Sequence, residues 1–472
     1  MTLQVKLSLL LVCTFVSPGT SAYKKGQGGG PNVLLIGVES LRADHVGCLG
    51  YFRDTTPTLD RLATEGVVFN RAMATSSWTI PAVMSVMTSL YPGLHNAKDF
   101  RQKTPEEITT LAEILKERGY VTVAFAGNPL LDGSYGFRQG FDLYDDFTVQ
   151  LHLGLDLFEE GGEITLDTVH DAVTNQAIHR AATSWLKANH GERFFMFVFY
   201  FDPHIDYIPP PPFDRKFDPD YEGAIDGKGL ASEPLRSTRP PQRDLDHIIA
   251  LYDGELLHTD GYISKLLDEF RKLGIWDDTL VVVFGDHGEE FYEHGSTVHG
   301  LTLYNEVLRI PLILRRPSVI PGNKKVGTLV NGVDIMPTIL DYLDIKYNGF
   351  MQGGSLRPLI EGKRSMLHDV VYAELNISPR DSSAAISRDE KIILDLHSGA
   401  RQIFDLNNDP CERDNLYNEQ LPLKEFAIES NLWSWLANNE KMSSQLFKDK
   451  DDLKIKIDES RVAGLRSLGY LQ

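Results

Sequence analysis

Short runs of apolar residues in this chain end at polar residues that suit a metal site. The run Val33–Val38 is followed directly by Glu39, and the run Thr279–Phe284 leads to Asp286 and His287. Runs of this length, rich in Val, Ile and Phe and bounded by Gly or polar residues, are typical of strands buried on both faces of a parallel sheet. Because ligands bind beyond the carboxyl ends of such strands, we expect these polar residues to share one functional edge.

Helical patterns alternate with the apolar runs. The clearest helix is Pro57–Glu65, because Thr56 is a suitable cap, Pro57 suits the first turn and Gly66 is a stop signal. Strands that alternate with helices predict an α/β fold with a doubly wound, mostly parallel sheet. Further helices are expected at Pro81–Ser89, Pro105–Arg118, Asn175–Ala188 and Leu245–Leu273, and further strands at Val121–Ala126, Phe194–Phe201 and Ile310–Leu314.

The pattern changes after about residue 366. Three short alternating segments, Val370–Glu374, Lys391–Leu396 and Gln402–Leu406, predict a small antiparallel sheet, and a helix is expected near Leu423–Leu436. We therefore expect a catalytic domain over residues 32–365, a C-terminal α+β subdomain over 366–440 and a polar tail over 441–472.

The N-terminus has the three-part layout of a secretory signal peptide. Lys6 precedes the apolar stretch Leu7–Val16, and small residues end at Ala22. The apolar core is too short for a stable membrane anchor, and no later run approaches the length of a membrane span. We predict a signal peptide over residues 1–22, a flexible linker over 23–31, and a secreted or periplasmic protein without a membrane span.

Composition excludes one class of partner and limits the use of cysteine. The 472 residues are 42% hydrophobic, as in an ordinary globular protein, and the formal net charge of −19 argues against nucleic-acid binding. Beyond the predicted signal peptide the chain keeps Cys48 and Cys411, which are not spaced as a zinc site. One disulfide and two ordinary buried thiols both remain open.

Glu39, Asp286 and His287 are the candidate metal ligands. Two carboxylates and an imidazole form a plausible set of ligands for one divalent ion such as zinc or manganese, with a position left for substrate. The alternative is structural, because Asp286 and His287 stand before Gly288 and could belong to a turn with a helix cap.

Thr79 is the candidate nucleophile. It stands directly before the predicted helix Pro81–Ser89, where the positive end of the helix dipole favours an alkoxide and an anionic substrate. A metal nearby would lower the pKa of the hydroxyl and make it a usable nucleophile. The alternative is that Thr79 only caps the helix, a position in which threonine is common.

His204 and His299 are expected on the substrate side of the metal. Either histidine could hydrogen-bond the transferring oxyanion or protonate the leaving group. The alternative is a second metal held by Asp202, His204 and His299, as in two-metal phosphoesterases. Three other histidines are interpreted as structural, namely His45, His258 and His294.

Several motifs, in one order along nearly the whole mature chain, resemble the sulfatase family of the alkaline phosphatase superfamily. The opening motifs are Glu39-Ser40-Leu41-Arg42-Ala43-Asp44-His45, Thr56-Pro57-Thr58-Leu59-Asp60 and Thr79-Ile80-Pro81. The middle and closing motifs are Phe201-Asp202-Pro203-His204, Asp286-His287-Gly288-Glu289, His299-Gly300, Arg309-Ile310-Pro311-Leu312, Val333-Asp334-Ile335-Met336-Pro337-Thr338 and Asp409-Pro410-Cys411-Glu412-Arg413. The resemblance implies that family's fold and a single divalent ion, zinc, manganese or calcium.

Three positions depart from the family pattern. Sulfatases usually have Cys or Ser followed by x-Pro-x-Arg, and that residue is oxidised to formylglycine; this chain has Thr79 instead, and Val83 where the Arg would stand. Threonine cannot form that aldehyde. The pair of acids after the first strand is reduced to Glu39-Ser40. The set of Glu39, Thr79, Asp286 and His287 resembles the metal site of phosphoethanolamine transferases and lipoteichoic acid synthases, which use a threonine nucleophile.

The sequence therefore predicts a metalloenzyme that cleaves an anionic ester, of phosphate type or sulfate, through metal-activated Thr79. Thr79 favours phosphoryl-type chemistry, whereas the family resemblance favours sulfate esters. The expected substrate is an anionic ester on a molecule such as a glycan or a lipid headgroup. Two alternatives stay open: a phosphoethanolamine or glycerol-phosphate transferase, and a catalytically silent relative that binds a sulfated or phosphorylated glycan.

Overall fold

The structure is a computed structural model, and it describes residues 30–146, 174–232, 235, 237–417, 427–446 and 453–455. The predicted signal peptide, most of the linker and most of the polar tail lie outside the described residues.

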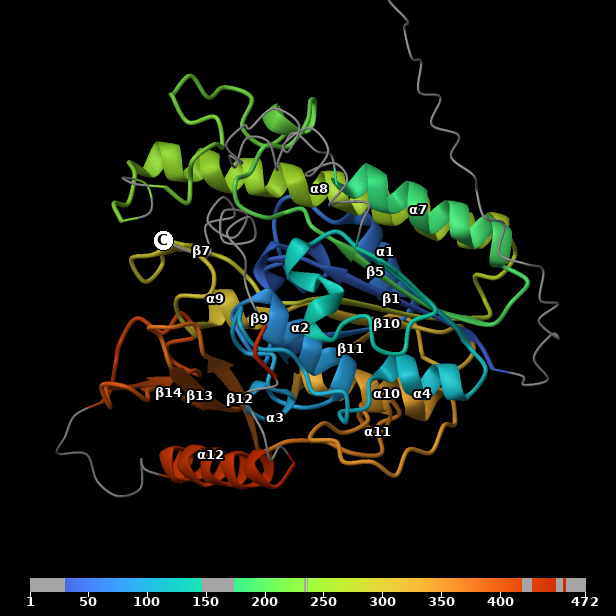
Figure 1. Cartoon of the computed structure of the whole chain (residues 1–472). Coiled ribbons are helices and arrows are strands. Elements are labelled where there is room, and N and C mark those ends of the chain that lie inside the picture. Colours follow the sequence, from blue (N-terminus) through green and yellow to red (C-terminus); the bar gives the residue numbers. More distant parts are fainter. Residues whose placement is uncertain are drawn as a thin grey trace, which may run out of the picture.

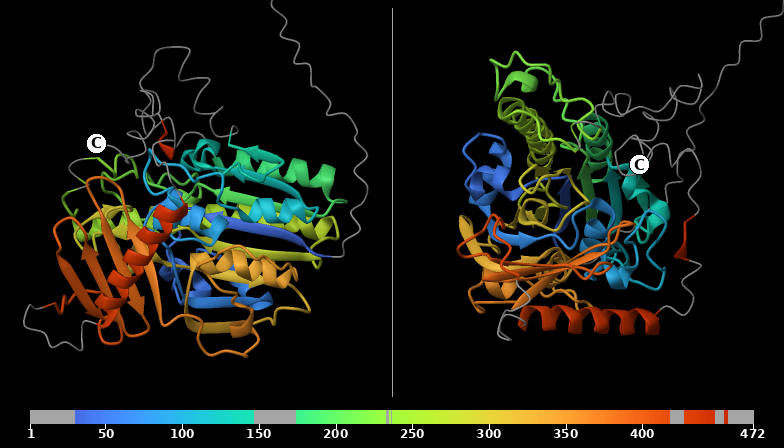
Figure 2. Two further views of the ribbon diagram at one scale, coloured as in Figure 1. Left: turned by 60° about the horizontal axis from the view of Figure 1, so that its bottom comes forward. Right: turned by 90° about the vertical axis from the view of Figure 1, so that its left-hand side faces the viewer.

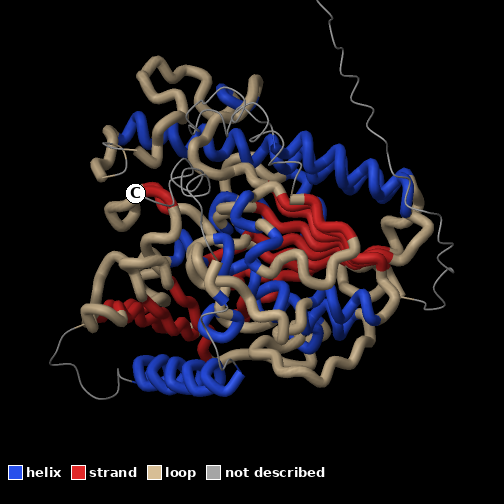
Figure 3. The backbone as a smooth tube through the Cα atoms, in the orientation of Figure 1, coloured by secondary structure: helices blue, strands red, loops and turns tan. Residues whose placement is uncertain are grey.

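Three fully buried parallel strands form the centre of the main sheet. β1 (Asn32–Val38) lies between β5 (Phe194–Tyr200) and β6 (Thr279–Gly285), and both neighbours run parallel to it. Every residue of these strands is buried, because helices cover both faces of the sheet (Figure 3). The uninterrupted apolar runs follow from this burial, so the predicted strands are confirmed.

The whole sheet is mixed and mostly parallel. β10 (Leu312–Arg315) is antiparallel to its neighbours, while the other strands of the main path run in one direction. The strand order is β11 (Lys324–Asn331), β2 (Val67–Met73), β10, β6, β1, β5, β3 (Val121–Ala126) and β4 (Leu143–Asp145). The pattern of apolar runs did not predict β2, β4 or β11.

Helices cover the two faces of the sheet and enclose two cores (Figure 1). One face carries α1 (Pro57–Glu65), α7 (Thr174–Asn189) and the long α8 (Gln242–Lys272). The other face carries α2 (Thr79–Thr88), α4 (Leu111–Glu117) and α10 (Ile335–Tyr342). The predicted doubly wound architecture is thereby confirmed.

Two predicted elements have different bounds in the structure. The helix expected from Pro105 begins only at Leu111, because Thr110 and Glu113 form a capping box that fixes its start. The strand expected at Ile310–Leu314 is divided at Pro311 into β9 (Arg309–Ile310) and β10, because proline has no N–H to donate to a ladder.

A four-stranded antiparallel sheet follows the main domain. The expected small antiparallel sheet is thereby confirmed, although the sequence pattern did not predict its second strand. Its strands are β12 (Val370–Leu375), β13 (Ser382–Ser387), β14 (Glu390–Asp395) and β15 (Arg401–Asp405), in that order. α12 (Ala427–Leu446) packs across this sheet and encloses a small separate core with it (Figure 2). The helix ends later than the expected Leu436, since residues beyond it keep contact with the main domain through Asn439.

Cys48 and Cys411 are both free thiols. Of the two interpretations left open by the sequence, the structure has unpaired cysteines, although Cys411 is exposed and not buried. None of the helices in the described ranges combines the length and the apolar character that a membrane crossing requires.

Candidate active site

Glu39, Asp286 and His287 meet beyond the carboxyl ends of β1 and β6. These strands are parallel neighbours, and Val38 pairs with Gly285, so the residues that follow them emerge at the same edge. One ligand atom from each of the three side chains lies within 4.8 Å of the other two, and all three residues are buried. His287 Nε2 is 3.1 Å from Glu39 Oε1 and 3.4 Å from Asp286 Oδ2.

Backbone contacts orient these side chains. Asp286 Oδ1 accepts hydrogen bonds from the Ser40 and His287 amides, at 3.1 and 2.8 Å, while Asp286 Oδ2 is buried without a hydrogen-bond partner. His287 Nδ1 lies 2.8 Å from the Gly288 carbonyl oxygen, which can only accept, so in the neutral ring Nε2 carries the lone pair and faces the carboxylates. A buried carboxylate oxygen without a donor, beside a second carboxylate and an imidazole lone pair, fits a divalent cation.

The electrostatics of the site indicate a missing positive charge. Burial opposes ionisation of Glu39, but its hydrogen bond with His287 and the charge of that residue hold the Glu39 pKa at about 2. Burial and the charge of Glu39 raise the pKa of Asp286 well above its usual range. Burial lowers the pKa of His287, but the charges of Asp286 and Glu39 outweigh it and raise that pKa to about 9. A proton on His287 thus partly neutralises two crowded carboxylates, where a cation would do so more completely.

Thr79 is the first residue of α2, and its hydroxyl points at this cluster. Thr79 Oγ donates to Glu39 Oε1 at 2.7 Å and lies 3.4 Å from His287 Nε2. Trp78 occupies the N-cap position and makes no side-chain cap, so the alternative that Thr79 only caps the helix is wrong. The hydroxyl is committed to the carboxylate cluster and not to the backbone of its own helix.

Two segments hold the loop before Thr79 through three hydrogen bonds. The Glu374 amide in β12 donates to the Thr75 carbonyl at 2.8 Å, and Ser76 Oγ donates to the Glu374 carbonyl at 2.6 Å. The Gly300 amide donates to the Ser77 carbonyl at 2.8 Å. The C-terminal sheet and the His299 segment therefore both position the loop before Thr79.

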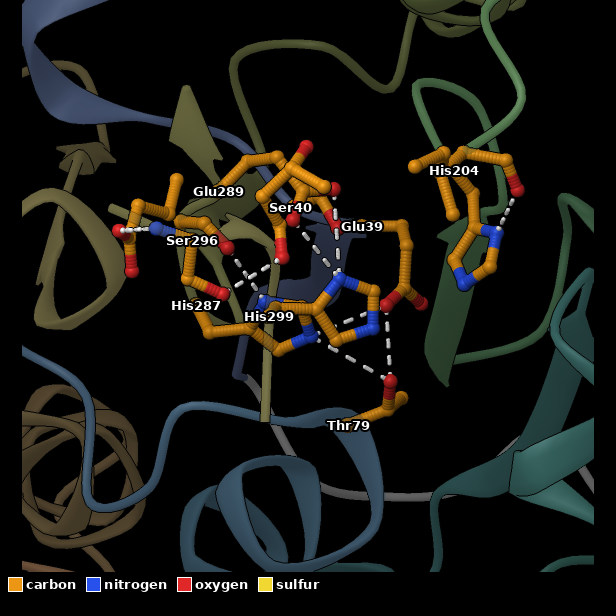
Figure 4. Close-up of polar contacts among 12 residues, drawn as sticks. Glu39, Ser40, Thr79, His204, His287, Glu289, Ser296 and His299 are labelled. Carbon is orange, nitrogen blue, oxygen red and sulfur yellow. Dashed lines mark hydrogen bonds and ion pairs between the residues drawn. The ribbon is translucent and has the colours of Figure 1, made fainter. Parts of the chain in front are cut away.

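His204 and His299 also lie beside Glu39 (Figure 4). Their ring centroids are 5.2 Å apart, and one ring nitrogen of each lies within 4.8 Å of a Glu39 oxygen. His204 Nδ1 lies 2.7 Å from the Ile205 carbonyl oxygen, so a neutral His204 ring carries its proton on Nδ1. Asp202 belongs to none of the groups of possible metal ligands among the described residues, but Glu39, His204 and His299 form such a group, so the two-metal alternative stays open with Glu39 in place of Asp202.

Glu289 and Asn128 join the site, although neither was among the predicted site residues. A Glu289 oxygen is 3.1 Å from His299 Nδ1, and the other accepts from Tyr207 Oη at 2.9 Å. Asn128 Nδ2 donates to Glu39 Oε2. Asn128 follows β3 by two residues, so the rule that located Asp286 beyond its strand would also have located Asn128.

The three histidines interpreted as structural lie in contacts of their own. His45 Nδ1 pairs with buried Asp253 at 2.7 Å, and His258 packs against two aromatic rings in tilted and edge-on contacts. His294 Nδ1 contacts Glu306 and its Nε2 contacts the Glu412 carbonyl, and His294, Glu290 and Glu306 form a further group of possible metal ligands.

Known proteins resemble this chain along most of its length. A family model described as sulfatase matches residues 31–345, and one described as N-sulphoglucosamine sulphohydrolase, C-terminal, matches residues 293–441. An arylsulfatase of Clostridium perfringens is 24% identical over 440 residues, which cover 83% of this chain and 91% of that protein.

Solved structures share the fold. A protein in complex with its substrate D-glucosamine-2-N,6-O-disulfate has a TM-score of 0.70 at 20% identity, covering 90% of this chain and 99% of that one. A phosphonate monoester hydrolase of Agrobacterium radiobacter has a TM-score of 0.68 at 19% identity, covering 88% and 96%. At these identities the likeness concerns the fold alone. The sulfatase model, however, covers two thirds of the sequence, and the chain belongs to the sulfatase family.

Proposed function

We propose that this protein is a metal-dependent hydrolase of anionic esters in which Thr79 is the nucleophile. The observation that carries the proposal is the position of Thr79 Oγ, 2.7 Å from Glu39 Oε1 and 3.4 Å from His287 Nε2, at the edge of a buried carboxylate cluster. A structural threonine would not need two carboxylates and an imidazole around its hydroxyl. The residues that would hold one divalent ion, zinc, manganese or calcium, are Glu39, Asp286, His287 and Thr79.

Each of these residues has a separate role in the proposed reaction. Thr79 Oγ forms the new bond to phosphorus or sulfur while the bond to the leaving oxygen breaks, and its proton is already directed at Glu39. A divalent cation in the site would supply positive charge that favours the ionised hydroxyl and the oxyanion of the transition state. His204 and His299 also lie beside Glu39, where they hydrogen-bond the non-bridging oxygens or protonate the leaving group. Water then releases the group from Thr79.

Both sulfate and phosphate-type esters fit this arrangement. The family includes sulfatases, and one structural neighbour is a phosphonate monoester hydrolase. A hydroxyl nucleophile without the aldehyde of formylglycine favours the phosphate-type ester. An acceptor alcohol in place of water would make the same site a transferase for phosphoethanolamine or glycerol phosphate groups.

A second candidate is a silent relative that binds a sulfated or phosphorylated glycan. Val83, which stands where sulfatases have an arginine, is completely buried in α2, so this position offers no charge to the substrate. A structural neighbour was solved with a sulfated glucosamine. Under this candidate the cluster would bind a metal and an anion without turnover.

A substrate panel tests the proposal. The purified protein, loaded in turn with zinc, manganese and calcium, is assayed on an aryl sulfate, a phosphate monoester, a phosphodiester and a phosphonate monoester. We expect turnover of at least one phosphate-type ester, and its loss in Asp286→Asn, which removes a ligand. Metal binding without turnover on any of the four esters would favour the silent relative. We also propose that residues 1–22 direct secretion, which N-terminal sequencing of the exported protein would test.

A further inference from the structure

A cavity of about 560 Å³ lies between the main domain and the C-terminal sheet. Its walls come from β2, β9, α9 (Asn305–Leu308), β13 and the segment after β15. Figure 1 shows α9 and β9 beside the strands of the C-terminal sheet. Cavities of this size hold small-molecule ligands.

Arginines dominate the charge of this cavity. Arg42, Arg71, Arg309 and Arg413 line it, together with the amide side chain of Asn305. Its acidic residues already have partners. Asp44 and Glu293 both pair with Arg42, and Glu306 pairs with His294.

Three of these arginines have no carboxylate partner among the described residues. Arg71 donates to the Arg388 carbonyl at 2.6 Å, and Arg309 Nε donates to the Asn70 carbonyl at 3.1 Å, so both are anchored by backbone oxygens. Arg413 is exposed at the rim. Anchored guanidinium groups facing a cavity are prepared to bind an anion, because little side-chain freedom remains to be lost on binding.

The crowding of positive charge in the cavity also favours the binding of an anion. Burial lowers the pKa of Arg71 below its usual value, and the charges of Arg309 and Arg388 lower it further, against the opposing charge of Asp389. Unpaired like charges in a partly buried cavity are unfavourable unless an anion neutralises them. The cluster stands out in a chain whose net charge is −19.

We propose that this cavity is a second anion-binding site, which takes a sulfate, phosphate or carboxylate group between Arg71, Arg309 and Arg413. Planar guanidinium groups bind such oxyanions through paired N–H donors. None of Glu39, Thr79, Asp286 and His287 lines the cavity, so the site is separate from the metal centre. The two are neighbours, because Arg42 in the cavity wall donates to the carbonyl of Glu289, whose carboxylate contacts His299.

Calorimetric titration of the metal-loaded full-length protein with inorganic sulfate and phosphate tests the site. Arg413→Gln changes an exposed side chain and leaves the fold unaffected, whereas Arg71→Gln/Arg309→Gln removes the two anchored groups. Arg61→Gln, an exposed arginine on α1, is the matched control. Because a hydrogen bond to a charged group contributes about 1.5–3 kcal/mol, we expect binding at this site to weaken about 10- to 100-fold for each arginine lost.

A second titration, with D-glucosamine-2-N,6-O-disulfate, identifies the source of the anion. Binding that is tighter than that of sulfate and lost in the same variants would show that the group is carried on a larger ligand. If the variants lose affinity for inorganic sulfate but the disulfate binds no more tightly than sulfate, the natural ligand is a free ion. Either result supports the site. Sulfate and phosphate affinities that are unchanged in Arg413→Gln and in the double variant would overturn it. The readout needs no turnover, so it is independent of the proposed reaction.

Discussion

At the scale of single residues, the site is defined by two buried carboxylates that have too few positive partners. Glu39 and Asp286 share one imidazole, and Asp286 Oδ2 has no hydrogen-bond donor. Burying charge without compensation is costly, and folded proteins keep such an arrangement where a ligand supplies the missing charge. The same geometry places the Thr79 hydroxyl beside the missing charge.

Asp286→Asn tests the metal site without disturbing the fold. The asparagine oxygen can still accept from the Ser40 and His287 amides, and its amide nitrogen takes the place of Oδ2, 3.4 Å from His287 Nε2. We expect unchanged thermal stability of the metal-free protein, whereas metal content falls from about one equivalent per chain to a small fraction of it. Elemental analysis after dialysis measures this. Wild-type metal content in the variant would show that the ion, if any, is bound elsewhere.

Glu289→Gln tests the orientation of His299. The Glu289 carboxylate accepts from His299 Nδ1 and from Tyr207, which fixes the ring and directs Nε2 to the site. Because such supporting partners typically contribute 10- to 100-fold, we expect kcat to fall by about that factor at unchanged metal content. Tyr207→Phe removes only the hydrogen bond between Tyr207 and Glu289, so it should lower kcat by a smaller factor. A normal kcat in Glu289→Gln would exclude a role for this contact.

At the scale of elements, the sequence predicted the strands of the main sheet that are buried on both faces and missed those that are not. β1, β5 and β6 are uninterrupted apolar runs, whereas β2 contains Asn70 and Arg71, and β11 carries two lysines. Register and neighbours across the sheet depend on tertiary packing, which periodicity does not encode.

The candidate site was predictable in part, for a related reason. Glu39, Asp286 and His287 follow predicted strands, and ligands bind beyond the carboxyl ends of parallel strands, so the sequence located these three residues. The contact of Glu289 with His299 could not be predicted, because it depends on the three-dimensional path of the loop that carries His299. In this loop Val298 has a φ of +73°. A β-branched residue is strained in that conformation, and nothing in the local sequence indicates it. The sequence motifs likewise did not indicate that Trp78, and not Thr79, is the N-cap of α2.

The α2 helix that carries Thr79 is tied down by a buried neutral histidine, His95. Its Nδ1 accepts from the Ala97 amide at 3.2 Å, so Nε2 carries the proton and donates to the Pro81 carbonyl at 3.2 Å. Burial lowers the pKa of His95 to about 3, against about 6.5 in the unfolded chain. The folded form therefore takes up its proton only at much lower pH than the unfolded form does.

Acid should destabilise the protein through this residue. The contribution of His95 is fully present above about pH 6.5 and is lost as the pH falls towards 3, at a rate of about 1.4 kcal/mol per pH unit. We expect His95→Gln to flatten the decline of urea stability between about pH 6 and 4, although it is less stable at neutral pH. Equal slopes for the wild type and the variant would mean that His95 does not titrate between the two states.

At the scale of the whole molecule, the C-terminal sheet supports the active-site loops. β12 holds the loop before Thr79, and Lys391 of β14 forms a fully buried ion pair with Glu412 at 2.7 Å. Glu412 also accepts from the Asn305 amide at 2.6 Å, and its carbonyl contacts His294. These contacts join the C-terminal sheet to α9 and to the segment that carries Glu289 and His299.

Breaking the buried pair should weaken this junction. Glu412→Gln leaves the Lys391 ammonium buried without a counter-charge, which typically costs about 3–5 kcal/mol of unfolding free energy. Lys391→Met/Glu412→Leu removes both charges and should recover most of that loss, since apolar pairs of similar volume replace buried ion pairs with little cost. Denaturant unfolding of the three proteins measures this. A double variant no more stable than Glu412→Gln would contradict it.

The central claim is that Thr79 forms the covalent bond to the transferred group, and the turnover of Thr79→Ala tests it most directly. The substitution removes one hydrogen bond to Glu39 and no helix cap, so it should cost only about 1 kcal/mol in stability. Thr79→Ser keeps the hydroxyl and serves as the matched control. We predict that kcat/KM on the best ester falls roughly 10³-fold or more in Thr79→Ala and far less in Thr79→Ser. A Thr79→Ala protein with wild-type kcat/KM would contradict the account.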